Sequence, residues 1–489
     1  MRSIEGIRVK LSRAPTSICI LTGLLLASEF IYIALLRFEA VNTARSVVSF
    51  IAILFALFGL YALACLLLTA IHPTRSVLGI VLLGTFLFRV TLLFAGLPPH
   101  ATWTEAKSRL RADLHGQAVT YDSFLLFDND IWRYLWDGHV SSGGVNPYVF
   151  EPNSSHLDQL VEDDPENATW ADIRANVNHK DVPTIYPPFA QMLFRSAHAV
   201  ASGSVFLMKS LFVASDLATV AMILFLLRLL RRPLTDVILY SWNPLVIKVV
   251  AGSGHMDAVL GTLLILMVLL LLRGQRSLAV TVWALAVLTK VTPVLLLPFL
   301  PYRVGWRRTA LGLGIVFAGY LPYLDKNGAP FVGLISFARE WQFNSGFVSL
   351  MELALTHLCS NPAALARALV IFALLIVLVY LLYRDWKGHL PFHSVVLLPL
   401  GAAFILSPTV MPWYIVPILP LAVIARSPLW FRFSAFLCLA FLVMINGSDN
   451  PWVLLVEWGA FAALMYLEYM GDKTQLSLLL RRAEPEGAS

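Results

Sequence analysis

The stretch FDNDIWRYLWDGHVSSGGVNPYVFEPN (127–153) holds the first residues that could carry out chemistry. Asp128 and Asp130 lie two positions apart, and Arg133 and Asp137 follow them. Capping a helix needs one acid at or just before the first turn, which is the simpler interpretation for one of the two. The other acid, with charged neighbours that tune its pKa, is a candidate catalytic base. We favour Asp128 as the base, because Asp130 directly precedes the helical pattern and is the more natural cap.

The residues after these acids predict the helix that positions them. Apolar residues at 131, 132, 135, 136 and 140 recur at helical spacing, so 131–140 is expected to form an interfacial helix. Arg133, Asp137 and His139 then lie on its other face. The sequence GGVNPY (143–148) ends the helix, because Gly and Asn-Pro stop helices.

Two further segments combine ionisable residues with apolar surroundings. NPLVIKVVAGSGHMD (243–257) contains Lys248, His255 and Asp257. Lys248 could simply extend its charge out of the membrane, and His255 with Asp257 could equally form a surface turn without a role. In LTKVTP (288–293), Lys290 lies beside a helix break. An unpaired lysine at membrane depth is costly, so it is more often functional than accidental.

Two outer segments add aromatic and amide side chains. EWQFNSG (340–346) contains Trp341 and Asn344, and SPTVMPWYIVP (407–417) contains Trp413 and Tyr414. These residues are candidates for binding a substrate, although Trp and Tyr also form belts at the membrane interface.

The composition excludes a soluble protein. Of 489 residues, 58% are hydrophobic and 13% are charged, against about 25% charged in soluble domains. Basic residues sit in short clusters between apolar runs, so the net charge of +6 does not suggest nucleic acid. The four cysteines have no pair spacing and read as buried small hydrophobes, so we predict no metal site and no cofactor. No Gly-rich phosphate loop is present for a nucleotide-dependent mechanism, whereas Lys290, Lys248, Arg133 and His255 could gather around a lipid phosphate.

Apolar runs long enough to cross roughly 30 Å of hydrocarbon predict an all-α, multi-pass membrane protein. They occur at about 16–37, 47–71, 77–97, 204–228, 235–251, 257–273, 308–324, 363–383, 392–408, 413–425, 430–446 and 451–470. The segment 277–301 is interrupted by Lys290 and Pro293 and is expected to be a broken, hairpin-like pair. We therefore predict about 12–14 transmembrane segments.

The distribution of Lys and Arg predicts the orientation in a cell (inner or plasma) membrane. Basic residues fill alternate loops, whereas the loops 252–256, 409–412 and 446–450 contain none. Both termini are then cytoplasmic, and the first helix is retained instead of being cleaved as a signal peptide. The chain is expected to be one domain (1–489), whose parts are N-terminal helices (1–97), an extracytoplasmic catalytic loop (98–190), a transmembrane core (191–470) and a cytoplasmic tail (471–489).

These segments together resemble a known family. FDNDIWRYLWDG…GVNPYVFEP, TIYPPFAQMLF (184–194), NPL…GSGHMDA, TKVTPVLLLP and PWYIVPILPL follow one another as in bacterial GT-C superfamily glycosyltransferases of the polyprenyl-phosphate-mannose-dependent type. The resemblance spans about residues 120–420. A fainter similarity exists to the enzyme that adds the first mannose to glycosylphosphatidylinositol.

The resemblance implies a GT-C fold and an inverting transferase on the extracytoplasmic face. Such an enzyme moves a hexose, with mannose leading through the resemblance, from a polyprenyl-phosphate donor to a lipid or glycan acceptor. The family's catalytic acid maps onto Asp128 or Asp130, and its phosphate-binding groups onto Lys290, with His255 and Arg133 as weaker candidates. The substrate-binding candidates are Asp137, Tyr186, Asp257, Trp341, Asn344, Trp413 and Tyr414. Val249 stands where relatives often carry an acid, which weakens a role for Lys248.

Two other functions fit parts of this pattern. A transporter or flippase of a lipid-linked saccharide also uses broken helices and charges at membrane depth. Against it, the acids concentrate in one long loop and no repeat symmetry is visible. A catalytically inactive scaffold is disfavoured because both loop acids are present. Glucose, arabinose and aminosugars stay open as the transferred sugar.

Overall fold

The computed structural model describes residues 14–38, 40, 43–96, 103–115, 125–162, 169–325, 330–446 and 450–483. The predicted basic segment before residue 14, the end of the tail and parts of the predicted outer loop (97–102, 116–124 and 163–168) lie outside these residues. The described chain is helical and has no strand, and its single β-bridge joins Phe343 to Thr409. The all-α prediction is confirmed.

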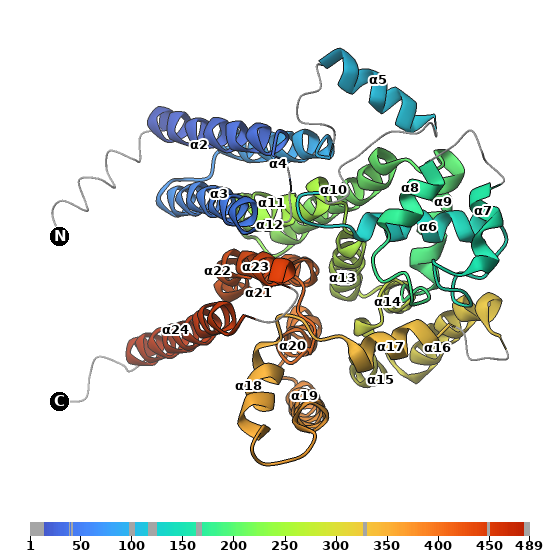
Figure 1. Ribbon diagram of the computed structural model, residues 1–489. Helices are drawn as coiled ribbons and strands as arrows, with labels where there is room; N and C mark the ends of the chain where they lie inside the picture. The colour runs from blue at the N-terminus through green and yellow to red at the C-terminus, as the bar shows by residue number, and fades with distance from the viewer. Residues whose placement is uncertain are drawn as a thin grey trace, which may run out of the picture.

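The helices follow one another along the chain with short connections (Figure 1). The first group is α2 (Ala14–Leu35), α3 (Ala44–Ala70), α4 (Arg75–Leu93), α5 (Trp103–Leu114), α6 (Asp130–Ser142), η1 (Ser155–Leu157), α7 (Gln159–Glu162), α8 (Thr169–Asn176), α9 (Pro188–Val200) and α10 (Val205–Leu229). The second is η2 (Leu234–Val237), α11 (Ile238–Ser241), α12 (Pro244–Ile247), η3 (Lys248–Gly252), α13 (Asp257–Leu272), α14 (Arg276–Val287), η4 (Thr292–Phe299), α15 (Leu300–Val304), α16 (Trp306–Tyr320) and η5 (Leu321–Tyr323). The third is α17 (Val332–Glu340), α18 (Gly346–Leu355), α19 (Pro362–Trp386), α20 (Phe392–Ile405), η6 (Pro412–Ile415), α21 (Leu419–Ala425), α22 (Pro428–Phe436), η7 (Leu437–Leu439), α23 (Ala440–Asn446) and α24 (Pro451–Ala483).

Six described helices are long and apolar enough to cross a membrane: α2, α3, α4, α10, α19 and the first part of α24. A seventh span arises if the pair 234–241 and 244–252, bent by 58°, is counted as one. Shorter apolar helices, including α13, α14 and α20, make up much of the remaining predicted spans. Large apolar side chains on these helices face outward, such as Phe30, which is 74% exposed. The chain is therefore a multi-pass membrane protein, and the number of 12–14 segments stays a prediction.

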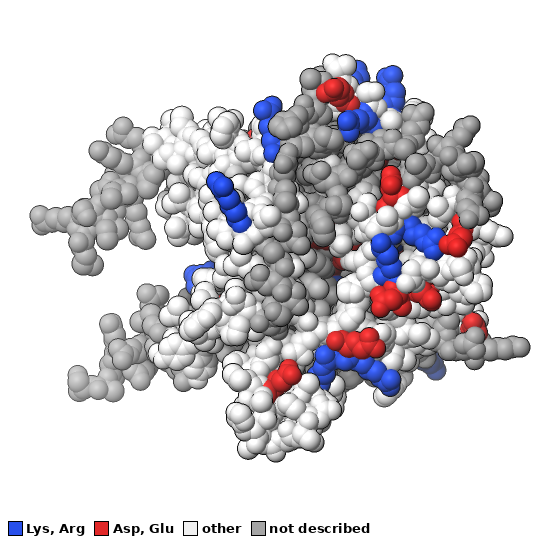
Figure 2. Space-filling model, viewed as in Figure 1, with Lys and Arg blue, Asp and Glu red and all other residues white. Residues whose placement is uncertain are grey.

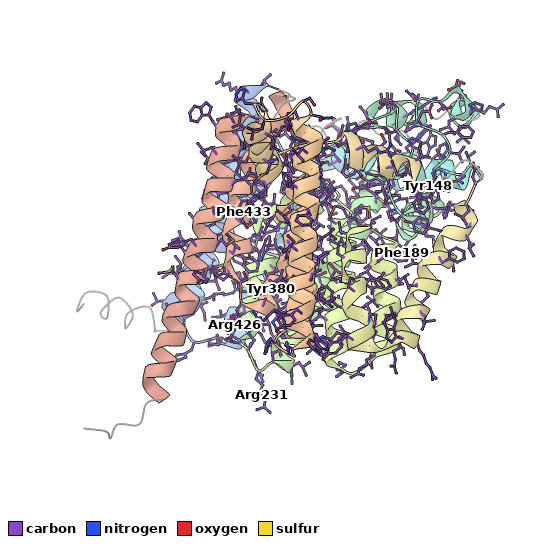
Figure 3. The ribbon with its side chains drawn as sticks, turned by 90° about the horizontal axis from the view of Figure 1, so that it is seen from below. Tyr148, Phe189, Arg231, Tyr380, Arg426 and Phe433 are labelled. Atoms are coloured by element: carbon purple, nitrogen blue, oxygen red, sulfur yellow. The ribbon has the colours of Figure 1, made fainter. Side chains whose placement is uncertain are left out.

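The two ends of the helix bundle differ in character. In the side view, Arg231 and Arg426 lie toward one end of the molecule, while Tyr148, from the loop region before α7, lies toward the opposite end (Figure 3). On the face shown in Figure 2, most charged side chains gather over the part where α5 to α9 and α17 lie, whereas the part over α2 and α3 is mostly uncharged. Among the described residues on this face, charged side chains are thus concentrated over α5 to α9 and α17.

Helix α6 forms where the sequence predicts it, but its surroundings differ from the prediction. All its residues from Ile131 to Ser141 except His139 are buried, so no face of α6 is left for water. It packs tightly on α9, because a Cβ at Gly138 would lie 2.6 Å from the carbonyl oxygen of Phe194. The face that carries Arg133, Asp137 and His139 is covered by α8 and α9, and the position of the helix at the membrane interface stays a prediction.

The predicted helix break at Lys290 is present between α14 and η4. The interruption is stabilised by bonds from other elements. The carbonyl of Leu288 accepts hydrogen bonds from the backbone N–H of Phe189 (2.8 Å) and of Ala190 (3.3 Å), at the start of α9. The indole N–H of Trp283 donates to the carbonyl of Pro293 (2.8 Å). Because the freed backbone groups find these partners, the break can be kept inside an apolar region.

Candidate active site

A tight turn before α6 determines the direction of the first acid. Leu126 and Phe127 adopt positive φ angles of 53° and 63°, which non-glycine residues rarely do. The N–H of Leu125 bonds to the carbonyl of Asp128 at 2.8 Å and closes the turn. Such strained backbone clusters at functional sites. The turn directs Asp128 into the protein.

Asp128 is buried beside a histidine and a lysine. One of its carboxylate oxygens contacts Nε2 of His255, and Nζ of Lys248 lies 3.9 Å from the same oxygen. Its other oxygen accepts the N–H of Asp130 at 3.2 Å. Burial alone would raise the pKa of the Asp128 carboxyl, but His255 and Lys248 outweigh it and hold this pKa below its usual range. Asp128 is therefore an ionised, enclosed group.

Lys248, one of the two residues beside Asp128, lies in an unusual helical turn. Lys248 begins η3, a π-helical segment, and π-helical turns frequently mark functional sites. The Lys248 ammonium lies 4.3 Å from the centroid of the Phe441 ring and is fully buried. The ring of His255 stacks on Trp413 at 4.1 Å. Lys248 and His255 thus form the inner wall behind the two acids.

Asp130 has a different environment. Its side chain is 17% exposed and lines two neighbouring cavities, whereas the Asp128 side chain is 2% exposed. The amide of Asn178 donates a hydrogen bond to it at 2.7 Å. Burial and the nearby negative charge of Asp128 raise the pKa of Asp130 to about 6. The surroundings of the two acids differ from those expected: Asp128 accepts the first N–H of α6, and Asp130 is the one that lines the cavities.

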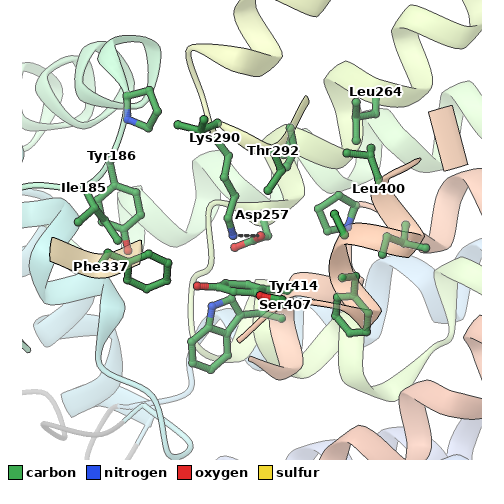
Figure 4. A pocket seen from close by; sticks show the side chains of 18 of the residues that line it. Ile185, Tyr186, Asp257, Leu264, Lys290, Thr292, Phe337, Leu400, Ser407 and Tyr414 are labelled. Carbon is green, nitrogen blue, oxygen red and sulfur yellow. Dashed lines mark hydrogen bonds and ion pairs between the residues drawn. The ribbon is translucent and has the colours of Figure 1, made fainter. Parts of the chain in front are cut away.

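The first cavity, which we call the apolar cavity, has a volume of about 200 Å³. Its walls come mainly from α13, α17, α20 and the segment after η6. Apolar side chains dominate them: Ile185, Leu260, Leu264, Leu334, Phe337, Leu400, Phe404 and Ile418. In the close-up, Lys290 and Asp257 lie between the side formed by Ile185, Tyr186 and Phe337 and the side formed by Leu264 and Leu400 (Figure 4). The cavity is therefore apolar at its sides and charged in its middle.

Lys290 is held in this cavity by two partners. Its ammonium lies 2.7 Å from a carboxylate oxygen of Asp257 and 3.7 Å from the centroid of the Tyr414 ring. The Lys290 side chain is 25% exposed, while that of Asp257 is 3% exposed. An ammonium carries three N–H donors, so one bond to Asp257 leaves capacity for a further anion.

The second cavity, which we call the polar cavity, has a volume of about 230 Å³. Five residues line both cavities: Asp130, Ile185, Tyr186, Trp413 and Tyr414. The rest of its wall is supplied by Asn129, Arg133, Asn178, His179, Val182, Pro183, Trp341, Met411 and Met444. Asp130 is the titratable carboxyl shared by both cavities, so a group in either one can reach it.

Two of the predicted phosphate-binding residues do not line the cavity that contains Lys290. His255 lines neither cavity, because its ring is enclosed by Asp128 and Trp413. Arg133 lines the polar cavity, whereas Lys290 lines the apolar one. The structure therefore does not bring His255 and Arg133 into one cavity with Lys290.

Asp137 and Asn344 also fall outside both cavities. Asp137 bonds Nε of Arg133 (3.0 Å), the hydroxyl of Thr184 and the amide of Gln191 (3.0 Å). Asn344 donates to Glu457 at 2.7 Å. Both are buried, so their surroundings indicate that they support the fold instead of contacting a substrate.

Two motifs of the segment 98–190 contact each other. The hydroxyl of Tyr148, from the segment GGVNPY, donates to the carbonyl of Tyr186 at 2.7 Å. This bond fixes the segment TIYPPF beside α6. Sequence reasoning missed two residues of the polar cavity, Asn178 and His179. Asn178 bonds Asp130, from which it is 48 positions away in the sequence. No spacing rule connects residues at that separation.

Among the described residues, one group could offer ligands to a metal ion: Asp128, Asp130 and His255, whose ligand atoms all lie within 4.8 Å of one another. A positive charge already lies beside this group, because the buried ammonium of Lys248 is 3.9 Å from Asp128. A divalent cation would have to bind against this charge, so the residues fit a cation poorly.

Comparison with known proteins gives one match. Residues 123–305 match the family model described as alpha-(1->6)-mannopyranosyltransferase, N-terminal domain. Neither the curated proteins nor the solved structures gave a match. The matched range contains Asp128, Asp130, Asp257 and Lys290. The match confirms the predicted enzyme class, a glycosyltransferase, and supports mannose as the transferred sugar.

Proposed function

We propose that the protein is an inverting mannosyltransferase of the GT-C type that takes mannose from a polyprenyl-phosphate donor and passes it to an acceptor on the extracytoplasmic face. The observation that carries this proposal is the position of Asp130, the carboxyl common to an apolar, lysine-containing cavity and a polar one. A single carboxylate between two binding spaces suits a direct displacement, in which one group activates the acceptor and no covalent sugar–enzyme intermediate is needed.

The apolar cavity suits a lipid-linked donor. Its leucine and phenylalanine walls match an isoprenoid chain, and Lys290 lies where a phosphate attached to that chain could sit (Figure 4). Asp257 and Tyr414 hold the ammonium in place. When the phosphate leaves, its charge grows, and a fixed cation stabilises that charge without reorganising.

Asp130 is the proposed base, in place of Asp128. In the reaction its carboxylate removes the proton of an acceptor hydroxyl while the oxygen attacks the anomeric carbon of mannose. The bond from that carbon to the phosphate oxygen breaks, and the phosphate keeps the electron pair. A pKa of about 6 leaves Asp130 largely ionised at neutral pH, yet more basic than an ordinary aspartate. Asp128 cannot take this role as readily, because His255 and Lys248 enclose it.

The charge distribution supports the extracytoplasmic side. Arg231 and Arg426 lie toward one end of the molecule and Tyr148 toward the other (Figure 3). Since Lys and Arg favour cytoplasmic loops, the end with the outer loop and the acids then faces away from the cytoplasm. The linkage named for the matched family, alpha-(1->6), is carried over here as part of the proposal. The transporter alternative gains no support from the family match.

The test supplies the purified protein with mannose in two forms, linked either to a polyprenyl monophosphate or to a nucleotide. A mannoside is the acceptor, and the anomeric configuration of the product is compared with that of the donor by NMR. We expect transfer only from the lipid-linked donor, with inversion. Transfer from the nucleotide-linked donor in lipid-free protein, or retention of configuration, would contradict the proposal.

A further inference from the structure

The polar cavity has Asp130 in its wall, but Lys290 lines the apolar cavity alone. The two cavities also share Tyr186, Trp413 and Tyr414. A ligand in the polar cavity would therefore meet the same carboxylate as a donor in the apolar cavity.

The side chains of the polar cavity combine flat rings with hydrogen-bonding groups. Trp341 and His179 lie with their ring centroids 3.9 Å apart and both border the space. The amides of Asn129 and Asn178 lie beside Asp130. Binding sites are typically built from such apolar and aromatic surfaces with a few placed polar groups. A sugar ring, with apolar C–H faces and hydroxyls at its edge, matches this combination.

The charges of the polar cavity favour a neutral ligand. Among the residues given above for its wall, Arg133 is the permanent cation, and the buried carboxylate of Asp137 already balances its charge. Its Nε bonds Asp137 at 3.0 Å, and its Nη2 donates to the carbonyl of Val182 at 2.9 Å. Burial lowers the pKa of His179, which keeps that ring neutral at pH 7. With Asp130 as the exposed acid, an anionic ligand would meet net repulsion.

The size of the cavity limits what it can enclose. Its volume of about 230 Å³ is smaller than the roughly 300–1,000 Å³ of cavities that enclose drug-sized ligands. One sugar ring fits these dimensions better than a chain of several. A longer glycan would leave its other units outside.

From these observations we propose that the polar cavity is the acceptor subsite and takes the terminal neutral hexose of a saccharide, with Trp341 and His179 as its stacking surface. This inference rests on the proposed function, because it assigns the acceptor of that reaction. It selects a glycan over a phosphorylated acceptor, and it makes Trp341 a residue that determines acceptor affinity without touching the donor.

The test compares Trp341→Ala with Trp341→Tyr, which keeps an aromatic ring, and with Trp306→Ala as the control. Trp306 is 77% exposed on α16 and belongs to neither cavity. Steady-state rates are measured while an α-linked mannose disaccharide and the polyprenyl-phosphate mannose are varied separately. We expect Trp341→Ala to raise the KM for the disaccharide about tenfold, as loss of an aromatic contact allows. Its donor KM should stay unchanged, and Trp341→Tyr should recover part of the loss.

A binding experiment separates this inference from the proposed function. Equilibrium binding of the same disaccharide is followed by saturation-transfer NMR without any donor, and inorganic phosphate is added as a competitor. Binding that is lost in Trp341→Ala, kept in Trp306→Ala and unaffected by phosphate supports the subsite even if the lipid-linked donor proves wrong. A raised donor KM in Trp341→Ala, unchanged disaccharide binding in that variant, or displacement by phosphate would overturn it.

Discussion

Nδ1 of His255 lies 3.7 Å from a carboxylate oxygen of Asp130, while Nε2 of the same ring contacts Asp128. One imidazole therefore stands between the enclosed acid and the acid that faces the cavities. Lys248 lies 3.9 Å from the Asp128 oxygen that His255 contacts. These neighbours hold the pKa of Asp128 below its usual range, whereas burial and the charge of Asp128 raise the pKa of Asp130.

The first prediction distinguishes the two acids. Asp130→Asn keeps the shape and the contact with Asn178 but removes the base, so turnover should fall by about 10²-fold or more. Asp128→Asn should keep more activity but weaken folding, because Lys248 and His255 lose their buried counter-charge. Turnover and thermal unfolding of both variants are the measurements. Near-normal turnover in Asp130→Asn would return the role of base to Asp128.

The pH dependence of turnover should follow the ionisation of Asp130. The base is active when deprotonated and its pKa is raised to about 6, so kcat should fall as the pH drops through about 6. In Asp128→Asn the neighbouring negative charge is gone, and the midpoint should move to lower pH, although burial keeps it above the value of an ordinary aspartate. A midpoint that stays in place, or moves upward, would show that another group controls the profile.

The sequence located the acids and the lysine because each carries a local signal. Asp128 and Asp130 precede a helical pattern, and Lys290 stands beside a proline at a helix break. Arg133 and Asp137 are four positions apart on one helix, a spacing that allows the ion pair they form. The different surroundings of the two acids could not be predicted, because they depend on the positive φ angles at Leu126 and Phe127 that turn Asp128 inward.

The polar cavity shows where sequence reasoning ends. Asn178 contacts Asp130 although the two residues are 48 positions apart in the sequence. Trp341, which follows α17, contacts His179, which lies between α8 and α9. Such contacts arise from tertiary packing and leave no periodic trace in the sequence. The exposure of α6 was misjudged for the same reason: an amphipathic pattern shows that one face is apolar, but not that α8 and α9 cover the other.

Removal of divalent cations should leave activity unchanged. Asp128, Asp130 and His255 could offer three ligand atoms, but the ammonium of Lys248 already provides positive charge beside Asp128. We therefore expect full turnover after treatment with EDTA and no stimulation by Mg²⁺ or Mn²⁺. Activity that is lost with EDTA and restored by Mn²⁺ would show that this cluster binds a cation.

The orientation can be tested by labelling cysteines in intact cells or sealed vesicles. Ser155, exposed in η1 of the predicted outer loop, is suited to a small replacement by cysteine, and Arg231 lies toward the end of the molecule opposite Tyr148. Ser155→Cys should react with an impermeant maleimide added outside, whereas Arg231→Cys should react only after the membrane is opened. The native cysteines of the parent chain give the background. Reaction of both from one side would contradict the proposed topology.

The pair Lys290 and Asp257 gives the sharpest test of the phosphate site. Lys290→Ala should lose most turnover, since a fixed cation opposite a leaving phosphate is comparable to an oxyanion donor and contributes on the order of 10²–10³ in kcat. This variant also leaves the carboxylate of Asp257 facing the phosphate without its counter-charge. Adding Asp257→Asn to Lys290→Ala should therefore restore part of the lost rate and lower the KM for the lipid-linked donor. Lys290→Arg should rescue only partly, because a planar guanidinium cannot replace a compact ammonium between Asp257 and the ring of Tyr414. Lys387→Ala is the control, because Lys387 follows α19 and lines neither cavity.

Two outcomes would contradict this prediction. If the double variant is no more active than Lys290→Ala, then Asp257 does not face the phosphate. Full activity in Lys290→Ala would remove the lysine from the reaction altogether.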